Sequence, residues 1–119
     1  MWLMTKYGFY SIVDKKPDEY HVRSRERLDL ENLIAAIPLA GATIIETPEA
    51  DYACRIIINK DTLLPLLSRL GETLDYSNFK SKIDSTPDQK HKPYHKVWDV
   101  LADALGAYGH KPGWMRGRR

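Results

Sequence analysis

Residues 1–14, MWLMTKYGFYSIVD, constrain the fold more than any other stretch, because they are almost uncharged and apolar on both sides. At the two-residue period of a strand both sides are apolar: Leu3, Tyr7, Phe9 and Val13 on one, and Trp2, Met4, Tyr10 and Ile12 on the other. A strand with one wet face alternates apolar and polar residues, whereas a strand covered on both faces is a nearly continuous apolar run. Residues 1–14 are therefore predicted to form one central strand with packing on both sides.

The segment that follows predicts a strand and a helix. Residues 15–18, KKPD, form a turn, and residues 19–25 then alternate in polarity as a half-buried strand paired with the first. Asp29 can cap a helix over residues 30–37, which carries an apolar stripe at helical spacing. Together these segments predict a strand–strand–helix unit.

A second segment predicts the same order of elements. Residues 43–46 and 52–59 read as a strand pair around a proline turn. Asp61 can cap a helix over residues 62–70, and Pro65 falls in its first turn, where a missing N–H costs least.

The two segments align without gaps, and matched residues hold equivalent places: Ile12 with Ile44, Arg23 with Arg55, and Asp29 with Asp61. We interpret this as a duplicated ββα unit. The predicted fold class is α+β, with a four-stranded antiparallel sheet and two helices on one face.

A third helix has no counterpart in this repeat. Residues 86–89, TPDQ, have helix-start chemistry, and an apolar face runs from Tyr94 to Tyr108. This C-terminal helix covers the second face of the sheet or lies beside the other helices, and in the latter case the bare face needs another subunit. One domain over residues 1–108 and a basic, flexible tail over 109–119 are expected.

Composition excludes several classes of protein. The 119 residues suit one domain, and a net charge of +2 is too small to argue for a polyanion partner. No apolar run is long enough for a membrane span, and the start lacks the pattern of a signal peptide. Cys54, the one cysteine, cannot form an internal disulfide and reads as a small buried hydrophobe. A cytoplasmic location is expected.

The first candidate site is a set of cations that point away from the apolar side of their strands: His21, Arg23, Arg25 and Arg55. If both units share a sheet, these side chains converge on one surface. Cations with aromatic residues such as Tyr7, Phe9 and Tyr10 nearby are how single-stranded nucleic acid is often held. The alternative is that the arginines pair across strands with acidic residues, namely Glu19, Glu26, Glu46 or Glu49.

The second candidate is the segment DYSNFK. Asp75, Tyr76, Asn78 and Lys80 offer an acceptor, a phenol, an amide and a cation, which could bind a phosphate or a carboxylate. The alternative is structural: Tyr76 and Phe79 anchor the connector, while Asp75 and Asn78 make turn hydrogen bonds.

The third candidate is the run of His91, His95 and Asp99, which stand one above another on a continuous helix at a spacing that zinc can use. Pro93 lies between the histidines and disturbs this geometry, and no cysteine is nearby. No metal and no cofactor is predicted.

Several segments in order resemble a family of small bacterial and archaeal proteins of unknown function: MWLMTKYGFYSIV at 1–13, VRSRERLDLENL at 22–33, DYACR at 51–55, DYSNFK at 75–80 and YHKVW at 94–98. The resemblance covers residues 1–105, and the chain looks like an archaeal member. The resemblance implies no activity, cofactor or substrate. It implies only that DYSNFK and the strand arginines matter.

The favoured interpretation is a non-enzymatic binding or interaction module that forms a homodimer. One alternative is binding of single-stranded nucleic acid or a nucleotide through Arg23, Arg25, Arg55 and Lys80. The other is a small enzyme around residues 75–80, with Asp75, Tyr76, His95 and Arg23 brought together by the fold.

Overall fold

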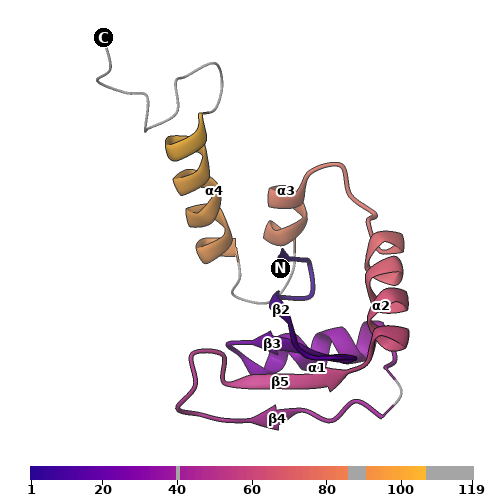
Figure 1. The fold of residues 1–119 in the computed structure, drawn as a ribbon. Helices are drawn as coiled ribbons and strands as arrows, with labels where there is room; N and C mark the ends of the chain where they lie inside the picture. The colour runs from indigo at the N-terminus through magenta and orange to yellow at the C-terminus, as the bar shows by residue number, and fades with distance from the viewer. Residues whose placement is uncertain (40, 86–90, 107–119) are drawn as a thin grey trace. The chain divides into compact units, whose positions relative to one another are not determined.

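The computed structural model describes residues 1–39, 41–85 and 91–106. These residues fall into two compact units, Met1–Ser77 and the chain from Asn78 onward (Figure 1). The predicted helix start at 86–89 and the predicted basic tail at 109–119 lie outside the described residues. The sequence also predicts a single domain over residues 1–108. Whether the two units form one domain depends on how they associate, so this stays a prediction.

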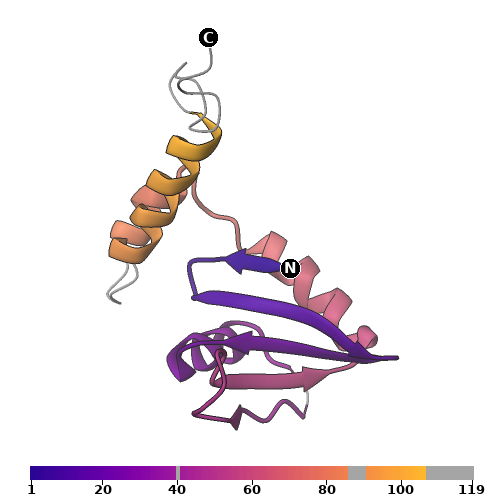
Figure 2. The same cartoon turned by 60° about the vertical axis from the view of Figure 1, so that its left-hand side comes forward.

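The first unit is built on a five-stranded, fully antiparallel sheet, whose strands are β1 (Trp2–Met4), β2 (Phe9–Lys16), β3 (Glu19–Ser24), β4 (Ile45–Glu46) and β5 (Cys54–Ile58). Their spatial order is β1-β2-β3-β5-β4, as Figure 2 shows. The α+β class is therefore confirmed.

Helices α1 (Arg27–Ala36) and α2 (Lys60–Glu72) pack on the same face of this sheet. The core lies between them and three strands, and its buried members are Tyr10, Ile12, Val22, Leu30, Leu33, Ile37, Cys54, Ile56, Ile58, Leu63 and Leu66. The central pair is Val22 of β3 opposite Ile56 of β5, and both side chains are fully buried. Placing two helices on one face of the sheet leaves the other face without a helix from this unit.

The prediction of one central strand over residues 1–14 is wrong. The chain reverses between β1 and β2, and β1 is an edge strand on which Trp2 is 73% exposed. Within the reversal the Thr5 hydroxyl donates to the carbonyl of Gly8 at 2.9 Å, and it accepts from the amide of Tyr7 at 3.1 Å. Gly8 has a φ of 155°, which side chains disfavour. The apolar run of residues 1–14 therefore contains a tight turn.

The prediction of a duplicated ββα unit in a four-stranded sheet is also wrong. The sheet has five strands, and the two hairpins are unequal, because β4 spans only Ile45–Glu46 whereas β2 spans Phe9–Lys16. The turn after β4 is closed by the Ala50 amide on the Thr47 carbonyl, at 2.9 Å. On the other side of β4, residues 42–44 are not part of the strand, so only Ile45 and Glu46 pair with β5.

The two predicted helix caps are not caps. Glu26 occupies the cap position of α1 without a side-chain hydrogen bond, and the Asn59 side chain caps α2 by accepting from the amide of Thr62 at 3.0 Å. Asp29 is buried instead. One of its carboxylate oxygens accepts from the amide of Phe9 at 3.2 Å, so α1 is fastened to the start of β2.

Cys54 is buried and free, as predicted. Burial raises the pKa of its thiol, and the nearby Glu46 carboxylate adds to that rise. The thiolate that reacts with electrophiles is therefore disfavoured.

No helix among the described residues is long and apolar enough to cross a membrane.

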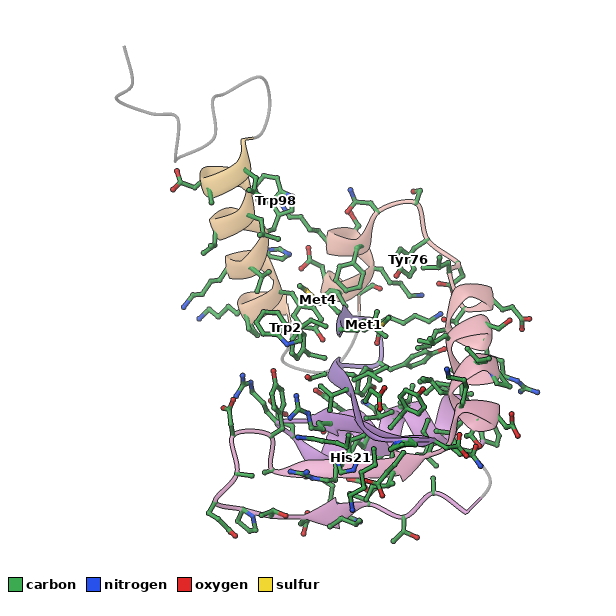
Figure 3. All side chains as sticks on the ribbon, in the orientation of Figure 1. Met1, Trp2, Met4, His21, Tyr76 and Trp98 are labelled. Carbon is green, nitrogen blue, oxygen red and sulfur yellow. The ribbon has the colours of Figure 1, made fainter. Side chains whose placement is uncertain are left out.

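The second unit contains α3 (Phe79–Asp84), which was not predicted, and α4 (His91–Leu105), which lies within the predicted C-terminal helix. The rings of Phe79 and Tyr94 stack with their centres 5.7 Å apart. The Lys80 ammonium lies 4.1 Å from the ring centre of Trp98. Figure 3 labels Trp98 on α4. These contacts join the two helices through aromatic faces.

The turn at Gly8 should tolerate no side chain. A Cβ at this position would lie 2.4 Å from Cγ of the buried Asp29, and the backbone angle adds strain. We expect Gly8→Ala to lower the free energy of unfolding by at least about 2 kcal/mol, measured by urea denaturation. The matched control is Gly71→Ala in α2, where a Cβ meets nothing within 4 Å. That change should raise stability by up to about 1 kcal/mol through helix propensity. Equal effects of the two substitutions would contradict this account of the turn.

Candidate anion-binding face of the sheet

The side of the sheet away from α1 and α2, here called the open face, carries one row of residues that crosses all five strands. Strand register places neighbouring members directly opposite one another in the order Trp2, Ser11, Arg23, Arg55 and Ile45. Directly opposed residues of antiparallel strands project to the same face. The row therefore presents an indole, a hydroxyl and two guanidinium groups in sequence.

The two arginines of this row face each other although they carry like charges. Arg23 lies opposite Arg55, and both side chains are half-buried. Arg23 Nη2 donates to the Ser11 hydroxyl at 2.7 Å, and the Nε of each arginine is buried without a hydrogen-bond partner among the described residues. Like charges directly opposite destabilise a sheet, and an unsatisfied buried donor costs free energy as well. The pair is therefore unfavourable for stability in the protein alone.

Neither arginine has a carboxylate within ion-pair distance among the described residues. The acidic side chains in this region are engaged elsewhere: Asp51 pairs with Arg25, Glu19 lies 3.2 Å from His21, and Glu46, on the helix-covered side of the sheet, pairs with Arg27 at 3.2 Å. The alternative of cross-strand pairing with glutamates therefore fails for Arg23 and Arg55.

His21 lies beside this pair on the open face (Figure 3) and is buried. Its Nδ1 lies 3.4 Å from Nη1 of Arg55, and its Nε2 lies 3.2 Å from Oε2 of Glu19. A guanidinium can only donate, so Nδ1 accepts, and the ring hydrogen sits on Nε2 and points to the carboxylate. His21 thereby holds Arg55 in place without neutralising its charge.

Tyr52 joins the third arginine, Arg25, to Arg23. The guanidinium carbons of Arg23 and Arg25 lie 4.6 and 4.4 Å from the centre of the Tyr52 ring, which is only 7% exposed. The hydrogen bond to Asp51 raises the pKa of Arg25. Two guanidinium groups are thus fixed by one aromatic ring, which orients them at little cost in side-chain entropy.

The structure brings together three of the six predicted ligand-binding residues, namely Arg23, Arg25 and Arg55. Tyr52, Ser11 and Trp2 belong to the same surface and were missed as site residues. Their place depends on the neighbours of each strand, and no local sequence signal gives that information.

The segment DYSNFK is largely structural. Asp75 pairs with Lys6 at 3.1 Å, and the Asn78 side chain caps α3 by accepting from the amide of Ser81 at 3.0 Å. Lys80 lies over the ring of Trp98. Tyr76 lines a cavity of the first unit, while Asn78 and Lys80 belong to the second. The alternative of local hydrogen bonds to the backbone fits Asn78, which makes one as a helix cap, whereas Asp75 is in an ion pair.

No group of three potential ligands that could hold a metal ion occurs within the described part of the chain. His95 Nε2 lies 3.1 Å from a carboxylate oxygen of Asp84, and Asp99 is exposed. The side chain of His91 lies outside the described residues.

Comparisons with protein-family models, with curated proteins and with solved structures found no match. What the open face binds therefore has to follow from its own chemistry.

Removing one member of the opposed pair should stabilise the protein. We expect Arg55→Gln to raise the free energy of unfolding by about 0.3–1 kcal/mol at low salt, because it relieves the repulsion from Arg23. The gain should shrink as salt screens the charges. Urea denaturation at two salt concentrations measures both effects.

The matched control is Arg25→Gln, which breaks the pairing with Asp51 and should lower stability slightly. A loss of stability in Arg55→Gln as large as in Arg25→Gln would indicate that Arg55 serves the fold rather than a ligand.

Proposed function

We propose that the protein is a non-enzymatic binding module, and that its open face binds single-stranded nucleic acid. The observation that carries this proposal is the unneutralised Arg23–Arg55 pair in one row with the exposed Trp2. Guanidinium groups bind phosphates, and an exposed aromatic ring accepts a stacked base.

The phosphate part of the interaction supplies what the arginines lack. Each guanidinium group is half-buried and has no carboxylate within ion-pair distance among the described residues, and a phosphate offers oxygens that can accept several N–H bonds at once. Its negative charge also converts the repulsion between Arg23 and Arg55 into a favourable arrangement. The stability lost in the free protein is thus regained in the complex.

The stacking part depends on the edge of the sheet. Trp2 packs edge-on against Phe9, with ring centres 6.0 Å apart, and this contact fixes the indole while most of its surface stays exposed. Trp2 and Arg23 are separated by one strand, which corresponds to about 10 Å across the sheet. A base on Trp2 and a phosphate on the arginines can therefore belong to one chain.

The net charge of +2 fits a local rather than a long-range electrostatic site. Charges more than about 8–10 Å apart are largely screened at physiological salt, so the few cations grouped on the open face matter more than the total. We expect modest affinity and a strong dependence on salt. We place this function in the cytoplasm.

An enzyme at DYSNFK has less support. Burial is the main reason for a raised pKa of the Tyr76 phenol, which makes it a poor general base at neutral pH. Asp75 is paired with Lys6, and Asn78 is used as a helix cap. The described residues of this segment therefore favour a structural role.

Binding of a fluorescently labelled single-stranded oligonucleotide, followed by anisotropy over a salt series, tests the proposal. We expect the double variant Arg23→Gln/Arg55→Gln to bind at least about tenfold more weakly at low salt. The slope of log affinity against log salt should fall by about 1.4, since each phosphate contact on a single strand contributes about 0.7. The control is Lys15→Gln/Lys16→Gln, which removes the same charge from exposed positions at the end of β2. If wild type does not bind at low salt, or if both double variants lose the same affinity, the open face is not the site.

A second candidate is self-association into a homodimer through β1. Met1 is 65% exposed and Trp2 is 73% exposed on an edge strand, and an exposed apolar edge can pair with another chain. The sequence predicted a dimer because residues 1–14 looked like one strand covered on both sides. That reason no longer applies, because β1 and β2 are separate strands, and the exposed edge of β1 takes its place.

Sedimentation equilibrium at micromolar concentration tests this second candidate. We expect a concentration-dependent dimer that Trp2→Ser converts to monomer, while Leu64→Ser on the exposed side of α2 leaves it unchanged. A strictly monomeric wild type would exclude a dimer at these concentrations.

A further inference from the structure

A cavity of about 270 Å³ lies in the first unit between β1 and the C-terminal end of α2. Its apolar lining comes from Leu3, Met4, Leu67, Leu70 and Leu74. Its remaining side chains come from Thr5, Lys6, Thr73 and Tyr76, and Figure 3 shows Met4 and Tyr76 on this unit. The cavity contains none of the five residues of the row on the open face, and Leu3 of its lining is on the core side of β1.

Most polar groups of the cavity are already used by the protein. The Thr5 hydroxyl bonds within its own turn, and the Thr73 hydroxyl donates to the carbonyl of Leu70 at 2.7 Å. The raised pKa of the Tyr76 phenol keeps that group neutral, so it adds no negative charge. The character of the cavity is therefore apolar with one ionic group, the ammonium of Lys6.

Lys6 is positioned to receive an anion. Its side chain is only 15% exposed, and its ammonium contacts Asp75, whose side chain is 56% exposed. An ammonium has three donors, and an ion pair with a carboxylate as exposed as that of Asp75 contributes little free energy. A ligand anion can therefore replace Asp75 at Lys6.

We propose that this cavity binds a small monocarboxylate with an unbranched apolar chain, whose head group pairs with Lys6 and whose chain lies against Leu3, Leu67 and Leu70. The volume supports this class, since 270 Å³ corresponds to about nine times the share of one water molecule in the liquid. A chain of about eight to ten non-hydrogen atoms therefore fits. The apolar lining favours the chain over a sugar or a nucleotide.

Isothermal titration with octanoate tests the proposal, with octanol as the neutral probe. We expect octanoate to bind more tightly than octanol, and Lys6→Gln to weaken octanoate binding about tenfold without affecting octanol. Asp75→Asn should strengthen octanoate binding about threefold, because it removes the competing carboxylate. A structural role for the Lys6–Asp75 pair would instead weaken binding in both variants.

Cavity occupancy is tested separately by Leu67→Trp, which fills the space and should abolish binding of both probes. The matched control is Leu64→Trp on the exposed side of α2, which should bind as wild type does. Circular dichroism of each variant establishes that it is folded. Absence of octanoate binding by wild type, or octanoate binding that survives both Lys6→Gln and Leu67→Trp, would overturn the proposal.

Discussion

The pairing of β3 with β5 is the constraint on which the rest of the first unit depends. One register places Val22 opposite Ile56 on the helix-covered face and Arg23 opposite Arg55 on the open face. A shift by one residue would exchange the faces, burying two guanidinium groups and exposing the centre of the core. The free energy of burying Val22 and Ile56 therefore also holds two like charges together, at a position that the protein alone does not favour.

A second contact, between α1 and the start of β2, positions the edge strand β1 of the open face. The carboxylate of Asp29, at the start of α1, accepts from the amide of Phe9, and the tight approach of Gly8 to Asp29 leaves no room for a side chain. This contact determines where β2 begins, and hence how β1 folds back against it. Trp2 comes opposite Ser11 only because that turn has this geometry. The aromatic end of the row is thus positioned by a buried contact on the other side of the sheet.

Local pattern predicted much of the secondary structure and less of its detail. The alternation over residues 19–25 corresponds to β3, and the helical stripes correspond to α1 and α2. The caps were wrong because several residues near each helix start can accept from a free amide, and packing of the helix against the sheet decides which one does. For α2 that residue is Asn59 rather than Asp61. The prediction of one strand over residues 1–14 was wrong because their apolar period continues through a turn.

The sequence by itself determined which side chains point away from the apolar side of each strand, because successive side chains of an extended backbone project to opposite faces. Alternation alone therefore separates Arg23 and Arg55 from the core. Only the tertiary structure decided that these two arginines oppose each other and that Tyr52 contacts Arg23 and Arg25. The physical reason is that strand neighbours and register follow from packing between residues far apart in the chain, and local periodicity contains no record of that packing.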